Sequence, residues 1–341
     1  MLTFFVTMTN RTLFVLSLLA VFLMMASCQH YHSDVPEVPA SKLPQVSIQI
    51  HRYGDALFHV DTTRFQVGIK ALKKHFPYFL DANLNDTANL NKLYAYVTDT
   101  QMLHIYRDTR AKFPNLKTET QQISKAFSHL KYYFPHYRLP WVYTYISGLY
   151  FEQPILKKDT VLIIALDDYL GKNYLPYAEL HIPLYHRRLM SREYMVVDVV
   201  NMLYFRDFHR PVRNKTLLDN MLEAGKQLYF LDTMMPQVAD SLKIGYTRRQ
   251  MQWMHEHKRD VWAVFVKNQF LYSTDYLMIN KLTQPGPFTE GFSRKSPARM
   301  ANWFGWQMVR SYMKRHPKMH LQDLLKWKDA QGLLEASGYK P

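Results

Sequence analysis

The residues best suited to metal chemistry are the histidines, and their spacing is poor for it. The chain has 15 histidines but no H-E-x-x-H, the pattern that places two zinc ligands and a general base on one helix. His255 and His257 point to different faces of an expected helix. His316 and His320 are separated by Pro317, which disfavours a continuous helix. The histidines therefore predict no metal site, and we expect no cofactor.

One acidic pair could do acid–base or cation chemistry. Asp167 and Asp168 follow an apolar run of strand character, and the end of a strand often opens onto a site. A turn or capping role before Gly171 is the commoner use of such residues. The chain has no G-x-S-x-G and no glycine-rich phosphate loop. Motifs alone therefore leave the chemistry open.

The single cysteine, Cys28, indicates export. Residues 1–27 carry Arg11 as their only charge, continue in an apolar run that is shorter than a spanning helix of ~20 residues, and end in Ala26-Ser27. Lipoprotein signal peptidases require a small residue before a lipid-modified cysteine. We predict a signal peptide over residues 1–27 and lipid attachment at Cys28. The alternatives are an ordinary secretory signal and an N-terminal membrane anchor.

The charge of the exported chain is strongly positive. Removal of residues 1–27 takes away one arginine and no acid, which leaves 42 basic against 28 acidic residues, or +14. An exported protein does not meet nucleic acid, so we expect anionic lipid headgroups, anionic glycans or acidic proteins as partners. The alternative is a solvated basic surface without a ligand. In some bacteria, an aspartate directly after the lipidated cysteine retains a lipoprotein in the inner membrane. Gln29 stands at that position here, so we expect an outer-membrane anchor that faces the periplasm.

The composition and the expected secondary structure, which must position these residues, predict a mostly helical α+β fold. Residues are 48% hydrophobic and 15% aromatic, which favours a dense helical interior. Pro36, Pro39 and Pro44 indicate an extended tether over residues 28–45, followed by one domain over residues 46–341. Strands are expected at residues 46–51, 141–146 and 160–166, which together form a small sheet in the N-terminal half.

The C-terminal half shows the periodicity of helices. Earlier helices are expected at residues 61–75, capped by Asp61, and at residues 123–134. Thr247 and Gln250 have the form of a capping box, and residues 284–287 are expected to form a turn or loop. Later helices are expected at residues 191–207, 217–231, 247–271, 298–316 and 321–336.

Several aromatic-rich segments carry a family resemblance. They are Lys131-Tyr132-Tyr133-Phe134-Pro135, Leu166-Asp167-Asp168-Tyr169-Leu170-Gly171, Ala224-Gly225-Lys226-Gln227-Leu228-Tyr229, Trp303-Phe304-Gly305-Trp306 and Ser337-Gly338-Tyr339-Lys340-Pro341. Together they resemble the gliding motility-associated lipoprotein family GldB of Bacteroidetes, from about residue 46 over nearly the whole chain. The resemblance implies a cell-envelope lipoprotein, held in the membrane through Cys28, that acts with envelope proteins of the gliding and type IX secretion machinery and without catalysis.

The family is also distantly similar to zincin-like peptidases, in which one helix carries H-E-x-x-H and a following helix supplies a glutamate ligand. The resemblance places Val197, Asp198 and Asn201 in the first motif and Glu223 in the second. Valine cannot bind zinc and asparagine binds it weakly, so Asp198, Asn201 and Glu223 are expected to be a vestigial site. Two alternatives remain open: a metal-dependent peptidase that uses Asp198, Glu223 and one of Asp167 or Asp168, and a basic module for anionic glycan or lipid.

Overall fold

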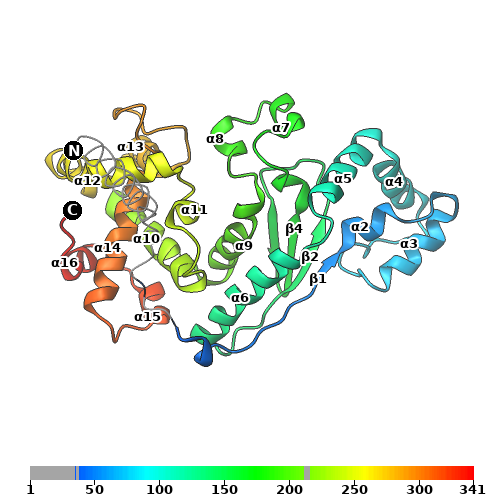
Figure 1. The fold of residues 1–341 in the computed structure, drawn as a ribbon, viewed down its shortest axis with the longest axis horizontal. Coiled ribbons are helices and arrows are strands. Elements are labelled where there is room, and N and C mark those ends of the chain that lie inside the picture. The colour runs from blue at the N-terminus through cyan, green and yellow to red at the C-terminus, as the bar shows by residue number, and fades with distance from the viewer. Residues whose placement is uncertain (1–34, 36–37, 211–215) are drawn as a thin grey trace, which may run out of the picture.

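The fold is α+β and mostly helical, as predicted. The structure is a computed structural model, and it describes residue 35 and residues 38–210 and 216–341. A small sheet lies in the N-terminal half, and the C-terminal half is helical. Figure 1 shows three parts in a row: an N-terminal helical lobe, the sheet with its covering helices, and the C-terminal helices. The predicted signal peptide and Cys28 lie outside the described residues.

The sheet has four strands in the order β1-β2-β4-β3. Strands β1 (Ile50–Arg52), β2 (Trp141–Tyr145) and β4 (Val161–Ala165) are parallel, and β3 (Ile155–Lys158) pairs antiparallel with β4 at the edge. The predictions at residues 141–146 and 160–166 are confirmed. Both strands are mostly buried, which explains their continuous apolar runs.

The strand predicted at residues 46–51 is confirmed only at its last two residues. The structure pairs only Ile50–Arg52 with β2. Before it, the amides of Val46 and Ile48 donate to the hydroxyls of Ser128 and Ser124, at 3.3 and 3.2 Å. The alternating pattern therefore reflects packing of an extended segment against a helix, since that also buries every second side chain. Ahead of this segment, within the predicted tether, Ala40–Lys42 form a 3₁₀ turn.

The N-terminal lobe forms a separate aromatic core around Tyr53, Leu57 and Ile69. Asp61 caps a 3₁₀ turn through the amide of Thr63, at 2.9 Å, and the chain then enters the predicted helix. The helices of the lobe and of its connection to the sheet are α2 (Tyr53–Phe58), α3 (Phe65–Lys73), α4 (Thr87–Thr98) and α5 (Thr100–Lys112).

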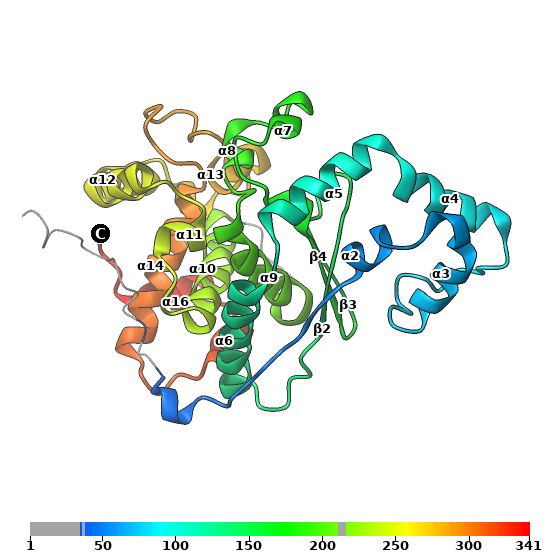
Figure 2. The same ribbon diagram turned by 45° about the vertical axis from the view of Figure 1, so that its right-hand side comes forward.

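Two helices beside the sheet connect it to the C-terminal part. Figures 1 and 2 both place α6 (Lys117–Tyr133) alongside α9 (Met195–Leu203), which contacts the edge strand β3. Helix α9 continues into a π-helical turn at Tyr204–Phe208, so the helix predicted at residues 191–207 is regular only in its middle. Two short helices, α7 (Leu175–Glu179) and α8 (Leu184–Arg187), precede it.

The C-terminal part contains the helices predicted before residue 317, of which the one expected to reach residue 271 ends at Lys267. Two shorter helices, at residues 240–244 and 276–283, were not predicted. The capping box of Thr247 and Gln250 is formed, and residues 284–287 lie outside helices. The single helix predicted at residues 321–336 is wrong, because Asp329 accepts a hydrogen bond from the amide of Gly332 at 2.8 Å and starts a new helix. The helices are α10 (Leu217–Met234), α11 (Asp240–Ile244), α12 (Arg248–Lys267), α13 (Tyr276–Thr283), α14 (Met300–Arg315), α15 (Leu321–Lys326) and α16 (Ala330–Ser337).

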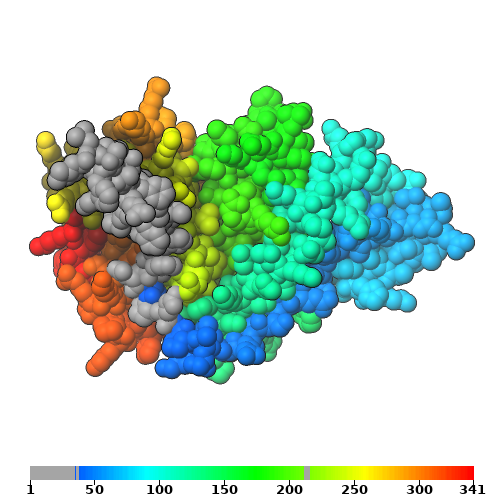
Figure 3. Space-filling view, in the orientation of Figure 1, coloured from blue at the N-terminus to red at the C-terminus, as the bar shows by residue number. Residues whose placement is uncertain are grey.

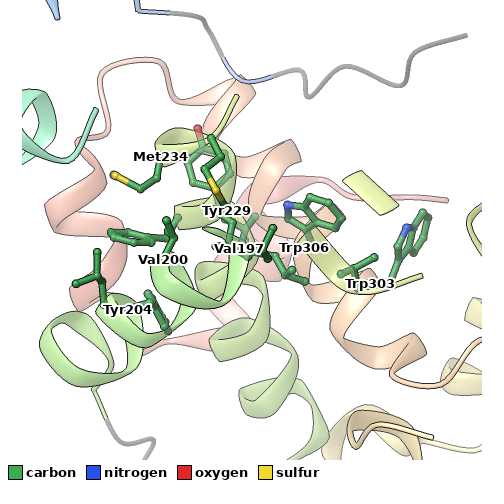
Figure 4. Close-up of a cluster of buried hydrophobic side chains, with 14 of the residues drawn as sticks. Val197, Val200, Tyr204, Tyr229, Met234, Trp303 and Trp306 are labelled. Carbon is green, nitrogen blue, oxygen red and sulfur yellow. The ribbon is translucent and has the colours of Figure 1, made fainter. Parts of the chain in front are cut away.

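Helices α10 and α14 cross closely at two glycines. A Cβ atom on Gly225 would lie 2.3 Å from the carbonyl oxygen of Gly305, and one on Gly305 would lie 1.8 Å from that of Met221. Around this crossing, Figure 4 shows side chains of α9, α10 and α14 in one cluster, among them Val197 and Trp306. The glycines therefore allow α10, the helix that carries Glu223, to pack closely against α14.

Candidate functional site

The first part of the predicted vestigial site lies on α9. Val197 is 3% exposed and packs in the core. Asp198 points elsewhere: its Oδ2 accepts a hydrogen bond from the phenol of Tyr169, at 2.9 Å. Burial raises the pKa of Asp198 to about 7, although this hydrogen bond and the charge of Arg299 oppose the change. Asp198 is thus a carboxyl group that titrates near neutral pH, a property shared by many general bases.

The second part of the predicted site is occupied by other polar contacts. Asn201 Oδ1 accepts a hydrogen bond from Gln227 Nε2 of α10, at 2.9 Å. Glu223 Oε1 lies 2.5 Å from Nζ of Lys226, whose side chain is 1% exposed and also donates to the carbonyl of Trp327. The ammonium group therefore already neutralises one oxygen of the Glu223 carboxylate.

His209 adds a further group to this cluster. Its Nδ1 lies 3.6 Å from Glu223 Oε2, and neither atom has a hydrogen-bond partner. Across the described ranges, no three His, Cys, Asp or Glu side chains lie close enough together to hold a metal ion. With a valine, an amide and a lysine at the positions concerned, the residues present do not fit a zinc site.

Sequence reasoning missed the partners of this site. Gln227 follows Glu223 by four residues and so shares a face of α10, a spacing that could have indicated it. Lys226 is one turn from Glu223 and could have been found in the same way. Tyr169 has no local signal, since it lies 29 residues from Asp198.

The other predicted pair, Asp167 and Asp168, lies in a 3₁₀ turn directly after β4. The Asp167 carboxylate accepts hydrogen bonds from the amides of Ser147 and Leu149, both at 2.8 Å. It therefore holds the loop that follows β2. The oxygens of Asp168 are buried without a hydrogen-bond partner, and burial together with the charge of Asp167 raises its pKa to about 8. Asp167 thus orders a loop, and burial raises the pKa of both carboxyl groups.

A large groove runs beside the start of α9. Its volume is about 770 Å³, and most of its lining is apolar. The walls come from residues 38–43, from α6, from the first turn of α9 and from the connection between α10 and α11, with Val197 among the lining residues. In Figure 3 the start of the described chain, in blue, crosses the lower edge of the molecule between the C-terminal and central parts. The chain that leaves Cys28 therefore borders this groove ten residues later, at Val38.

The fold and its site define a helix-rich α+β protein with an apolar groove and a polar cluster that does not suit zinc. The sequence model of the family described as "Gliding motility protein GldB" matches residues 33–341. The chain belongs to this family, and membership makes it a gliding motility-related lipoprotein anchored by lipid in the cell envelope. No curated protein and no solved structure is detectably similar to it. None of the helices described here is both long and apolar enough to span a bilayer.

Proposed function

We propose that the protein is a non-catalytic accessory component that binds partners of the gliding and type IX secretion machinery at the periplasmic face of the outer membrane. The observation that carries the proposal is the pairing of polar groups within the cluster: Asn201 with Gln227, and Glu223 with Lys226. The distant zincin resemblance would place metal ligands at Asn201 and Glu223. The apolar groove offers a surface for an envelope protein.

The groove is also expected to lie close to the membrane. One wall is made by residues 38–43, which follow the predicted lipid attachment site by only ten to fifteen residues. A tether of ten residues spans at most roughly 35 Å. The groove is therefore kept close to the bilayer, where a partner in the envelope can reach it.

The test is affinity purification of the tagged, lipidated protein from its own envelope, with mass spectrometry and metal analysis of the same sample. Val238→Lys places a charge in the apolar groove, at a half-buried position. Leu277→Lys is the matched control, because Leu277 is 76% exposed on α13. We expect motility or secretion components to be lost with Val238→Lys and kept with Leu277→Lys. Equal recovery with both variants would argue against the groove.

A metal-dependent hydrolase is the second candidate, and the observation in its favour is that Glu223 Oε2 and His209 Nδ1 lie 3.6 Å apart without hydrogen-bond partners. It predicts one bound zinc per chain and loss of that zinc in Asp198→Ala or Glu223→Ala. Stoichiometric zinc without motility or secretion partners would favour a metal-dependent hydrolase over the accessory role.

A further inference from the structure

A small hollow is lined by residues of α8 and the turn after it, of the turn between α11 and α12, and of the segment before α14. Arg188 and Arg299 both line it, together with Tyr246 and the apolar residues Leu189 and Pro285. Its volume is about 20 Å³. A water molecule needs roughly 10–15 Å³ on this measure, so the enclosed part of the hollow holds one or two oxygen atoms, and the rest of any larger ligand must lie at its open side, beside the exposed Pro285.

Both arginines are satisfied only by neutral acceptors. Arg188 Nη2 donates to the carbonyl of Gly245 at 2.9 Å, and its Nη1 lies 3.3 Å from Gln250 Oε1. Arg299 donates to the carbonyl of Ile244. Within the described part of the chain, neither guanidinium forms an ion pair, and the buried Nε of Arg188 has no acceptor. Two cations therefore line one hollow without an ion-pair partner among the described residues.

The surroundings do not compensate these charges. Burial lowers the pKa of Arg299, and the nearby charge of Arg188 acts in the same direction. The carboxyl group that acts on Arg299 is Asp198, which is hydrogen-bonded to Tyr169 and has a pKa of about 7. It is thus only partly ionised at neutral pH. Because a buried cation is costly unless it is paired, the hollow is short of an anion.

The hollow is also built before any ligand arrives. Gly245 has φ +72°, and a Cβ atom there would lie 2.7 Å from Nη2 of Arg299. Gln250, which accepts from Arg188, is itself held by the amide of Thr247 at 2.9 Å in the capping box of α12. Such preorganisation lowers the entropic cost of binding.

We propose that Arg188 and Arg299 bind the carboxylate of an apolar residue, as presented by the C-terminus of a peptide. The guanidinium group is suited to a carboxylate because it offers donors in a planar fork. Leu189, Pro285 and Ala298 supply an apolar wall for the adjoining side chain. This site is separate from the groove and goes beyond the accessory role proposed above.

The test measures binding to the full-length, lipidated protein in detergent by isothermal titration. The probe is a tetrapeptide of three alanines and a C-terminal leucine, compared with the same peptide as its C-terminal amide and with acetate. We expect the free acid to bind about tenfold or more tightly than the amide, because charge-assisted hydrogen bonds are lost in the amide. Acetate is expected to bind more weakly than the acid peptide, since it lacks the apolar side chain.

Variants assign the effect to the hollow. Arg188→Gln and Arg299→Gln are expected to abolish the preference for the acid. Arg248→Gln removes the same charge from an exposed position on the first turn of α12 and is expected to keep it. Equal binding of acid and amide by the wild type would overturn the proposal without any variant. A preference that survives both hollow substitutions, or acetate binding as tightly as the peptide, would overturn the assigned site or ligand class.

Discussion

At the residue scale, the chemistry of the site depends on which polar groups meet. Asn201 and Glu223 each have a partner from α10, whereas Asp198 is paired with a phenol from the end of the sheet. Three residues expected to share one site thus face different neighbours. Among these contacts, burial raises the pKa of the Asp198 carboxyl group to about 7.

Asp198→Asn tests that titration through stability. The folded-state pKa of about 7 lies above the ordinary value of 3.8, so ionisation favours the unfolded chain. The wild type therefore loses stability as pH rises from about 4 to about 7, and an amide does not. We expect the variant to gain on the order of 3 kcal/mol in free energy of unfolding at about pH 7.5, and much less at about pH 4.

Urea unfolding at the two pH values measures this difference. The amide oxygen of the variant can still accept from Tyr169, so the hydrogen bond is retained. Asp260→Asn, at an exposed position of α12, is the control and should show no such pH dependence. A stability difference between Asp198→Asn and the wild type that is the same at both pH values would contradict the raised pKa.

Cys28→Ala tests the anchor. Without the thiol there is no group to alkylate, so we expect either unprocessed precursor or soluble periplasmic protein. Membrane fractionation and the intact mass of the wild type and the variant provide the measurement. An unchanged membrane fraction with the normal mature mass would show that lipid at Cys28 is not the anchor.

At the element scale, the crossing of α10 and α14 positions Glu223 and Gln227. Buried charges also link these helices to α11: Asp232 accepts from the indole of Trp306 at 2.8 Å, and its carboxylate pairs with Lys243 and Arg310. Arg310 lies 3.8 Å above the Trp306 ring. The close backbone approach and this network fix the relative orientation of the three helices.

Gly305→Ala is expected to disrupt this crossing, because the added Cβ would lie 1.8 Å from the carbonyl oxygen of Met221. Overpacking of this kind costs about 2 kcal/mol or more in free energy of unfolding. Gly286→Ala is the control: its Cβ would have only ordinary contacts, from 3.6 Å outward, and should change stability by less than about 0.5 kcal/mol. Urea denaturation compares the two, and equal effects would show that the crossing tolerates a methyl group.

At the scale of the whole molecule, the core is divided unevenly. The main cluster joins the sheet with α6, α9, α10 and α14, whereas the N-terminal lobe has its own small aromatic core around Ile69. Tyr53 and Phe79 stack there with ring centres 3.9 Å apart. A small separate core is expected to open more readily than a large one.

Native-state hydrogen exchange tests this division. We expect amides in the middle of α4 to exchange faster than those in the middle of α10 and α14, since α4 has Val97 as its only fully buried residue whereas α10 and α14 are buried over much of their length. Equal protection in all three helices would show that the lobe and the main core unfold as one unit.

Patterns along the chain were sufficient for the fold class, for two of the predicted strands and for the capping box of Thr247. Each of these depends on neighbours within a few residues, which is why apolar periodicity and capping residues predict them. The export signal expected before Cys28 stays a prediction. Local patterns failed at residues 46–49, where contact with a helix far away in the sequence imitates the alternation of a strand.

Only the tertiary structure decided what the site residues contact. Asn201 meets Gln227 across two helices, Asp198 meets Tyr169 from the end of the sheet, and Arg188 meets Arg299 from segments more than a hundred residues apart. These arrangements depend on how the helices cross and on how side chains fill the space between them. Helix crossing and side-chain packing cannot be read from the spacing of residues along the chain. The sequence by itself therefore determined the elements and the family resemblance, while packing determined which charges are paired, which are buried and where the groove and the hollow lie.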